Sequence, residues 1–190
     1  MRAIVLASSS SGRSELLRRA GLSFIVDPSD CDETVEASSP ADHVRLLALR
    51  KARTVAERHA HAIIIGADTI IELDGAILGK PDSPAAAENM LASLAGQFHR
   101  LVTGIALVDS DDGHSYCGVE TTLVHTRHLT AEQIHSYVAS GEPMGKSGSY
   151  DIQGLGATII DRIEGDFSNV VGLPMAHLAR ALEAFGVRLP

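Results

Sequence analysis

The sequence predicts an α/β protein in which helices flank a mixed, partly antiparallel sheet. Early in the chain, apolar runs typical of buried strands alternate with helical patterns, an order that favours parallel pairing. Farther along, Asp74-Gly75 separates two short β-like runs and is typical of a hairpin turn. Two long β-like segments, 98–108 and 115–128, then lie on either side of a turn at Asp109–Gly113. Parallel and antiparallel signals in one chain predict a mixed sheet.

The first part of the chain is predicted to hold three strands and two helices. Gly21 ends the first helix, and Ser39-Pro40 begins the second as an N-cap followed by proline at the first helical position. In order, the elements are strand Ala3–Ala7, helix Ser14–Ala20, strand Phe24–Asp27, a helix from Pro40 to about Arg58 and strand Ala62–Asp68.

The remaining elements also have local signals. Ser83-Pro84 repeats the N-cap and proline pair, and Thr130 with Gln133 forms a capping box. In order, the elements are the hairpin strands Ile70–Leu73 and Ala76–Leu78, a helix ending at Ala95 before Gly96, the long strands Phe98–Val108 and Ser115–His128, a helix ending at Ser140-Gly141, a glycine-rich stretch Gly141–Gly156, strand Ala157–Glu164 and a last helix from Pro174 to Phe185.

Composition narrows the class of protein. The 190 residues, 45% of them hydrophobic, are enough for one domain with a sizeable core, and we expect a single domain of two lobes over residues 1–190. The formal charge of −8 argues against binding to nucleic acid or to an anionic membrane surface. Cys31 and Cys117 lie in no metal-binding spacing, and no apolar run suits a signal peptide or a membrane span. We therefore expect a reduced, cytoplasmic protein.

The turn after the first predicted strand gathers groups that phosphate oxygens bind. Ser8, Ser10 and Arg13 bring two hydroxyls and a guanidinium to the N-terminus of a helix, where backbone N–H groups also favour anions. The alternative is an N-cap serine followed by a surface arginine, and this turn alone does not decide between the two.

Asp68 ends the most β-like run of the chain, so we expect it at the carboxyl end of a buried strand. Open α/β sheets bind ligands outside those strand ends, where a carboxylate can hold a metal ion or orient water. The alternative is a cap at a turn. Thr69, the next residue, either donates its hydroxyl to a ligand or packs as a β-branched strand residue.

Two lysines stand out. Lys51 falls on the apolar face of the helix predicted over 40–58. There it either packs its aliphatic chain against the core or meets an anion, and the pattern by itself favours packing against the core. Lys80 lies between Gly79 and Pro81 on a stiff turn, which suits either a phosphate ligand or an ordinary exposed lysine. The glycine spacing there is not that of a Walker A loop.

Further polar groups lie in two other turns. The acidic turn of Asp30, Asp32 and Glu33 can add a metal ligand, although clustered acids in turns are usually only solvated. Gln153, in the glycine-rich stretch, carries an amide donor and acceptor that either read the edge of a nucleobase or satisfy loop backbone groups.

Together these residues predict phosphoryl or nucleotidyl chemistry. Cations hold phosphates and carboxylates hold a divalent metal in such sites; the candidate cations are Arg13, Lys51 and Lys80, and the candidate carboxylates are Glu33 and Asp68. The sequence lacks a zinc-binding His/Cys spacing, a Gly-x-Ser-x-Gly elbow and a Gly-x-Gly-x-x-Gly turn after the first strand. Zinc sites, serine hydrolases and dinucleotide-binding proteins are therefore disfavoured.

Linked motifs carry a resemblance to a known family. They are Leu6-Ala7-Ser8-x-Ser10-x-x-Arg13-x-Glu15-Leu16-Leu17, Gly66-Ala67-Asp68-Thr69-Ile70, Gly75-x-Ile77-Leu78-Gly79-Lys80-Pro81, Gly141-Glu142-Pro143, Lys146-x-Gly148-x-Tyr150-x-Ile152-Gln153-Gly154 and Val171-Gly172-Leu173-Pro174. With these motifs the chain resembles the Maf family of nucleoside triphosphate pyrophosphatases over nearly its whole length.

The resemblance implies an elongated, Maf/ITPase-like α/β fold with a deep cleft between two lobes, often in a homodimer. It implies hydrolysis of a nucleoside triphosphate between the α and β phosphates, with Mg²⁺ or another divalent cation such as Mn²⁺. Asp68 corresponds to the proton acceptor and Glu33 to an acidic partner, and we expect these two carboxylates to hold the cation. The residues that correspond to the phosphate path are Ser8, Arg13, Lys51 and Lys80, and we expect Ser10 and Glu33 to bind substrate with them.

The resemblance also concerns the nucleobase of the substrate. Thr69 and Gln153 match the branch of the family that acts on dTTP and UTP, rather than the branch that acts on 7-methyl-GTP. Two departures leave the preferred base open, because Gly12 replaces a common arginine at a position linked to substrate choice and Gly145 replaces a common aspartate. A non-enzymatic nucleotide-binding regulator of cell division and a nucleotidyltransferase remain alternative functions.

Overall fold

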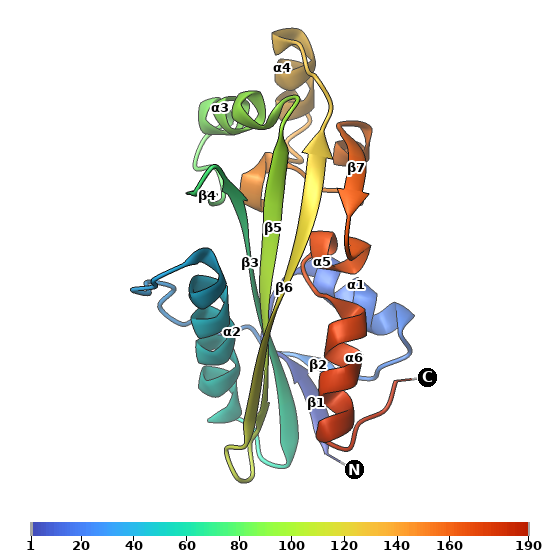
Figure 1. Cartoon of the computed structure of the whole chain (residues 1–190). Coiled ribbons are helices and arrows are strands. Elements are labelled where there is room, and N and C mark those ends of the chain that lie inside the picture. The colour runs from blue at the N-terminus through green and yellow to red at the C-terminus, as the bar shows by residue number, and fades with distance from the viewer. Residues whose placement is uncertain (1, 190) are drawn as a thin grey trace. The chain divides into compact units, whose positions relative to one another are not determined.

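The computed structural model describes residues 2–189, which form two compact units (Figure 1). Unit 1 comprises residues 2–68, 103–120 and 172–189, and unit 2 comprises residues 69–102 and 121–171. Three long strands contribute to both units; they are β3 (Ala62–Leu73), β5 (Phe98–Asp109) and β6 (Ser115–Thr126).

The sheet is mixed, as predicted. Its strands hydrogen-bond in the order β2-β1-β3-β5-β6-β7, and β4 pairs with β3. β1 (Ala3–Leu6) runs parallel to both β2 (Ile25–Val26) and β3. β4 (Ala76–Leu78) is antiparallel to β3, and β7 (Ile160–Glu164) is antiparallel to β6. The hairpin turn at Asp74-Gly75 is confirmed, with both residues in the left-handed region at φ values of 50° and 85°.

Both faces of the sheet in unit 1 are buried, which explains its uninterrupted apolar strands. Successive strand side chains point to opposite faces. Ile63 and Ile65 therefore pack with α1 (Ser11–Arg19) and α6 (Met175–Ala184), whereas Ile64 packs with α2 (Pro40–Ala56).

Two glycines let α2 lie directly on this sheet. A Cβ atom at Gly66 of β3 would lie 2.2 Å from the carbonyl oxygen of Ala48. A Cβ atom at Gly104 of β5 would lie 2.2 Å from the carbonyl oxygen of Val44. Real side chains do not approach backbone this closely, so both positions require glycine for the observed packing of helix on strand.

Unit 2 covers its strands with α3 (Pro84–Leu94) and α4 (Ala131–Ala139), and it also contains the short helices α5 (Phe167–Val171), η1 (Ser147–Ser149) and η2 (Leu155–Thr158). Its core joins strand residues such as Ile71 and Leu101 to Leu91 of α3 and Tyr137 of α4. The predicted capping box is present, since Thr130 and Gln133 each accept a backbone N–H from the other.

Several predicted boundaries are wrong for local reasons. The first helix begins at Ser11 rather than at Ser14, because Ser10 caps it by accepting the Arg13 N–H. The strand predicted from Ala157 begins at Ile160, because residues 155–158 form a 3₁₀ turn. The predicted strand Ala62–Asp68 does not end there and continues as β3 to Leu73. Helix α5 was not predicted, since five residues are too few for a periodic signal.

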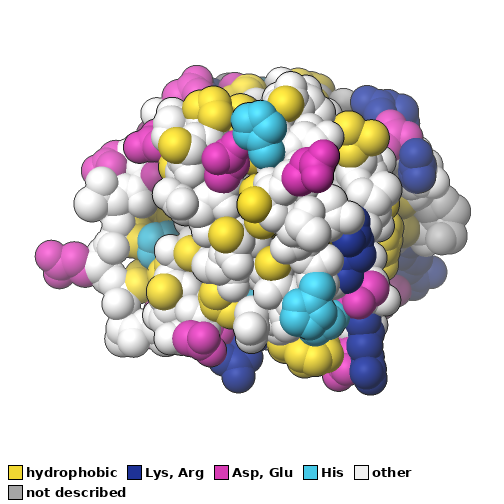
Figure 2. All heavy atoms as spheres, turned by 90° about the horizontal axis from the view of Figure 1, so that it is seen from above, with side chains coloured by type: hydrophobic (Ala, Val, Ile, Leu, Met, Phe, Trp, Pro, Cys, Tyr) yellow, Lys and Arg dark blue, Asp and Glu magenta, His cyan; other side chains and the backbone are white. Residues whose placement is uncertain are grey.

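The surface is mostly polar on the face shown in Figure 2. Hydrophobic side chains lie scattered among other atoms there, acidic side chains are spread over the face, and most Lys and Arg side chains lie on its right-hand side. Among the helices of the described residues, none combines the length and the apolar character that crossing a bilayer requires.

Substitution of Gly66 by alanine tests the contact between helix and sheet. We expect Gly66→Ala to lower the free energy of unfolding by about 1–3 kcal/mol, because the added methyl group meets the Ala48 carbonyl and α2 must shift. Urea unfolding measures the change. Gly79→Ala is the matched control, since a Cβ atom at Gly79 meets nothing within 4 Å. Equal stability of the two variants would contradict the contact.

Candidate active site

A buried ion pair joins α2 to β3 in unit 1. Lys51 Nζ lies 2.7 Å from Asp68 Oδ1, and the two side chains are only 10% and 11% exposed. Asp68 follows Ile64 and Gly66 at intervals of two, which turns its side chain toward α2. Lys51 follows Leu47 by one helical turn on the buried face of α2. Lys51 therefore meets an anion, and the interpretation that it only covers the core with its stem is wrong.

Glu33 is the second carboxylate at Lys51. Its Oε1 lies 2.9 Å from Lys51 Nζ, and its side chain is 60% exposed. The segment that carries Glu33 is fastened to α2, because the Arg50 guanidinium donates to the carbonyl oxygens of Asp32 and Thr34 at 2.7 Å each. Within the segment, the backbone N–H of Thr34 donates to Asp32 and lowers the pKa of that carboxylate. One ammonium group thus holds a buried carboxylate and an exposed carboxylate together.

The serine-rich turn before α1 is tied to Arg13. The Arg13 Nη1 donates to Ser8 Oγ at 3.0 Å and to the Ala67 carbonyl at 3.0 Å, and Nε donates to the Gly172 carbonyl at 2.8 Å. Ser8 Oγ also accepts the Ser10 N–H at 3.2 Å. The guanidinium is therefore anchored inside unit 1, so the interpretation of Arg13 as a surface arginine is wrong. The interpretation of Ser10 as an N-cap is confirmed.

The charges of Arg13, Asp68 and Glu33 act on one another. Burial lowers the pKa of the Arg13 guanidinium, and the two carboxylates oppose this shift by favouring its charged form. Gly12 lies in the first turn of α1, where its N–H and that of Ser11 have no acceptor within the helix. Helix N–H groups and a guanidinium are the donors that phosphate oxygens bind.

Asp68 is not at the carboxyl end of a strand, contrary to the prediction. β3 continues through Thr69, Ile70 and Ile71 to Leu73, because β-branched side chains favour an extended backbone. Asp68 is instead a buried acid in the middle of a strand of 12 residues, and it is the last residue of that strand assigned to unit 1. Its side chain pairs with Lys51, so the alternative of a turn cap is also wrong.

The other candidate residues belong to unit 2. Thr69 is half-buried, and its carbonyl accepts the Ser147 hydroxyl at 3.3 Å. Lys80 is exposed after β4, and the carbonyl of the preceding Gly79 accepts the Gly148 N–H at 3.0 Å. Gln153 is exposed in the turn before η2. The glycine-rich segment is thus bonded to the residues that precede Lys80 and follow Asp68, and the roles of Thr69, Lys80 and Gln153 stay predictions.

Glu142 anchors the turn that carries Gln153. Its Oε1 accepts the Tyr137 hydroxyl and the Gly156 N–H, and its Oε2 accepts the Leu155 N–H, each at 2.8 Å. Asp151 adds a second anchor, because its Oδ1 accepts the Gln153 N–H at 2.9 Å. Burial raises the pKa of Asp151. The hydrogen bonds from Lys146 and from the Gln153 N–H lower it by more, so the pKa of Asp151 is lowered overall.

A buried histidine holds the start of the same segment. His99 Nε2 lies 2.9 Å from the Tyr150 hydroxyl, and both residues are buried. Burial, and secondarily the charge of His125, lowers the pKa of His99 to about 4. Burial also raises the pKa of the Tyr150 hydroxyl. His99 is therefore neutral at pH 7.

Asp68 and Glu33 supply some, but not all, of the ligands that a metal ion needs. Among residues 2–189, no group of three or more His, Cys, Asp or Glu side chains is arranged to hold a metal. Asp68 and Glu33 do converge on one point, the ammonium of Lys51, and Asp68 keeps Oδ2 outside that contact. Magnesium sites commonly use one or two carboxylates together with substrate phosphates and water. The two carboxylates therefore fit an ion that a phosphate substrate helps to bind.

Sequence reasoning missed three supporting residues. Arg50 positions Glu33, Glu142 positions the Gln153 turn, and Gly66 brings α2 onto β3. Arg50 looks like an ordinary surface charge in the sequence, and Glu142 falls within the motif Gly141-Glu142-Pro143 without a role of its own. A glycine inside a β-like run is a signal of close backbone approach and could have identified Gly66.

A double-mutant cycle tests the buried pair. We expect Lys51→Met to lower the free energy of unfolding by about 3 kcal/mol, because it leaves the buried Asp68 carboxylate without its partner. In the Asp68→Asn background the same substitution should cost at least about 1 kcal/mol less. Urea unfolding of the wild type, both single variants and the double variant supplies the four values. Additive effects would show that the two side chains do not interact.

The neutral His99 predicts a pH dependence of stability. Its pKa is 6.5 when unfolded and about 4 when folded, so the unfolded chain binds more protons between these values. Stability from this group is fully present above pH 6.5, and about 3 kcal/mol of it is lost as the pH falls to 4. Urea unfolding across this range should show a shallower loss for His99→Gln, which does not titrate. Identical slopes for variant and wild type would contradict a neutral buried histidine.

Comparison with known proteins identifies the family. The model of the Maf-like protein family matches residues 3–185. Proteins named dTTP/UTP pyrophosphatase are 50% identical to this chain in Moorella thermoacetica, covering 98% of this chain and 97% of that protein, and 49% identical in Symbiobacterium thermophilum, covering 98% and 95%. A solved dITP/XTP pyrophosphatase from Mycobacterium abscessus aligns over 96% of this chain and 98% of its own at 17% identity, with a TM-score of 0.46. On the match over residues 3–185 and these identities, the chain belongs to the Maf-like protein family.

Proposed function

We propose that this protein is a nucleoside triphosphate pyrophosphatase that hydrolyses dTTP and UTP to the monophosphate and pyrophosphate. One observation carries the proposal: Lys51 holds Asp68 and Glu33 together in the unit that also anchors Arg13 at the start of α1. The relatives named dTTP/UTP pyrophosphatase supply the substrate, since they are about half identical over nearly the whole chain.

Asp68 is the proposed proton acceptor. The water oxygen bonds to the α-phosphorus, the bond from that phosphorus to the bridging oxygen breaks, and the electron pair leaves with pyrophosphate. The proton lost by the water passes to the Asp68 carboxylate. Lys51 holds this carboxylate in place, which is the positioning that general base catalysis requires.

The cations are proposed to bind the phosphates. Arg13 and the first-turn N–H groups of α1 offer donors to phosphate oxygens. Lys51 has an ammonium with three donors and uses two of them on Asp68 and Glu33. Lys80 is the further phosphate ligand that the family resemblance implies. Fixed positive charge of this kind stabilises charge that develops on the leaving pyrophosphate.

A divalent cation is also proposed. The charges of Arg13, Lys51, Glu33 and Asp68 sum to zero, so this cluster does not neutralise a triphosphate by itself. Asp68 and Glu33 would hold Mg²⁺ or Mn²⁺ together with substrate oxygens. When bound, the ion neutralises phosphate charge and polarises the phosphoryl group. The homodimer and the cytoplasmic location stay predictions.

Pyrophosphate release tests the function. The chain is incubated with dTTP, UTP and a panel of other nucleoside triphosphates, with Mg²⁺ and without any acceptor molecule. We expect pyrophosphate from dTTP and UTP, and none after chelation of the cation. Asp68→Asn should lower kcat by at least about 100-fold, while the dissociation constant for the nucleotide changes by less than about threefold.

Asp112→Asn is the matched control, because Asp112 is exposed in unit 1 and its role as acceptor for the His114 N–H is open to asparagine. Its kcat should equal that of the wild type. Binding without pyrophosphate release would favour the nucleotide-binding regulator. Release that requires an added acceptor would favour the nucleotidyltransferase. Full activity of Asp68→Asn would remove Asp68 from the mechanism.

A further inference from the structure

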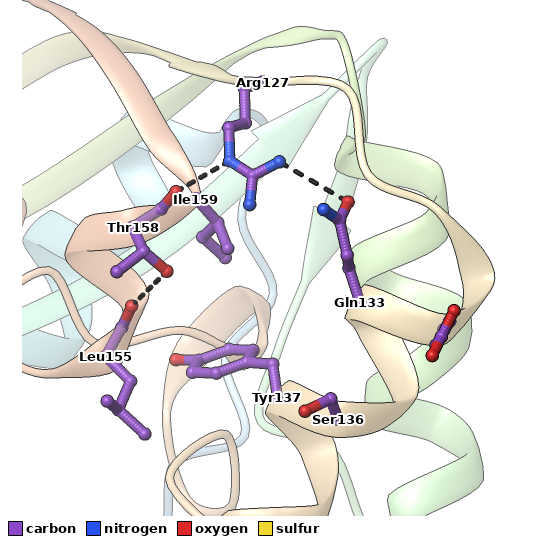
Figure 3. Close-up of a pocket in the computed structure, with 8 residues that line it drawn as sticks. Arg127, Gln133, Ser136, Tyr137, Leu155, Thr158 and Ile159 are labelled. Atoms are coloured by element: carbon purple, nitrogen blue, oxygen red, sulfur yellow. Dashed lines mark hydrogen bonds between the residues drawn. The ribbon is translucent and has the colours of Figure 1, made fainter.

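Unit 2 contains a cavity of about 390 Å³ that the proposed reaction does not use (Figure 3). Its walls come from the residue that follows β6, from α4, and from η2 with the residue that follows it. Small-molecule sites typically occupy 300–1,000 Å³ and combine apolar walls with a few converging polar groups. The volume of this cavity falls within that range.

The apolar part of the cavity is formed by Tyr137, Leu155 and Ile159. Tyr137 presents only its ring, because its hydroxyl donates to Glu142 at 2.8 Å and accepts the Asp151 N–H at 3.1 Å. Leu155 is 55% exposed, so its surface is open to a ligand. A flat or branched apolar group can therefore pack here without displacing any protein contact.

Arg127 supplies positive charge to the same cavity. Its Nε donates to the Thr158 carbonyl at 2.7 Å, and its Nη1 donates to the His128 carbonyl at 3.1 Å and to Gln133 at 3.4 Å. These bonds fix the guanidinium plane. Nη2 has no hydrogen-bond partner within residues 2–189, and Figure 3 shows it directed into the cavity.

Two neutral donors of α4 line the cavity, Gln133 beside Arg127 and Ser136 next to Tyr137 (Figure 3). Gln133 and Ser136 are three residues apart on α4 and so share a face of the helix. Gln133 uses its amide oxygen for the capping box and for Arg127, and neither its amide nitrogen nor the Ser136 hydroxyl bonds to another described residue. Glu132 also lines the cavity, but it is exposed, so solvent screens its charge. The converging donors favour an anionic group.

We propose that this cavity is a binding site for a small carboxylate with an apolar body. The carboxylate accepts hydrogen bonds from Arg127 and Gln133, and the apolar body packs against Tyr137, Leu155 and Ile159. The two oxygens of a carboxylate accept several N–H donors at once, and these two neighbouring side chains offer such donors. The site does not depend on the proposed hydrolysis, and its test is a measurement of binding.

Titration of the isotope-labelled full chain with 3-phenylpropionate, followed by two-dimensional NMR, tests the proposal. We expect saturable shifts of the backbone amides of Arg127, Ser136 and Leu155, with a dissociation constant of about 1 mM for a ligand of this size. 2-Phenylethylamine has the same ring with a positive charge and should not shift them. Equal binding of the amine, or no saturable shift with the carboxylate up to about 10 mM, overturns the proposal.

A charged and a neutral substitution at one residue of the apolar wall provide a matched pair of variants. Arg127 is a poor choice for substitution, because it also holds the Thr158 and His128 carbonyls. Leu155 has an exposed side chain, so Leu155→Glu and Leu155→Gln should both fold. Leu155→Glu should weaken 3-phenylpropionate binding about threefold more than Leu155→Gln does, because the added charge repels the carboxylate although solvent screens part of the repulsion at this exposed position. Equal affinity in the two variants overturns the assigned position of the carboxylate.

Discussion

The contact between Lys51 and Asp68 is the constraint on which the rest of the site depends. Both charged groups are taken out of water, and a buried charge without a partner is costly. The pair therefore requires α2 to lie close to β3, and the glycines at 66 and 104 permit that approach. The requirement is reciprocal, because any shift of the helix would separate the charges. Packing and electrostatics thus specify the same arrangement.

Under the proposed function, this arrangement would let an acidic protein bind an anion. The chain has a formal charge of −8, so its overall field repels phosphates. At the site, however, Arg13 is anchored through backbone carbonyls and Ser8, and Lys51 presents its ammonium between two carboxylates. Local donors held in fixed positions can bind phosphate oxygens regardless of the net charge, because they need little reorganisation when the ligand arrives.

In unit 2, the Glu142 carboxylate holds the turn that carries Gln153 in place. Glu142 accepts three hydrogen bonds, one from α4 and two from the first two residues of η2. The same bonds turn the Tyr137 ring and Leu155 toward the cavity below Arg127. The glycine-rich segment is therefore ordered by bonds to side chains rather than by a strand or a long helix.

Local signals predicted most of the elements correctly. Ser39-Pro40, Ser83-Pro84 and the Thr130 capping box begin α2, α3 and α4 where the sequence indicated, and Asp74-Gly75 forms its turn. These features depend on interactions within a few residues, which a sequence displays directly. Boundaries were wrong where a cap or a 3₁₀ turn changed the end of an element, as at Ser10 and before Ile160.

The sequence by itself determined the class of fold and the types of side chain at the site. The alternation of strand and helix patterns, the capping residues and the charged residues can all be identified from the order of the amino acids. Only the tertiary structure decided that Lys51 meets Asp68 rather than the core, that Asp68 lies within a strand, and that Arg50 and Glu142 position their neighbours. These contacts join residues from different elements. Which residues meet in these contacts depends on how the helices and strands pack, and a local sequence pattern does not predict that packing.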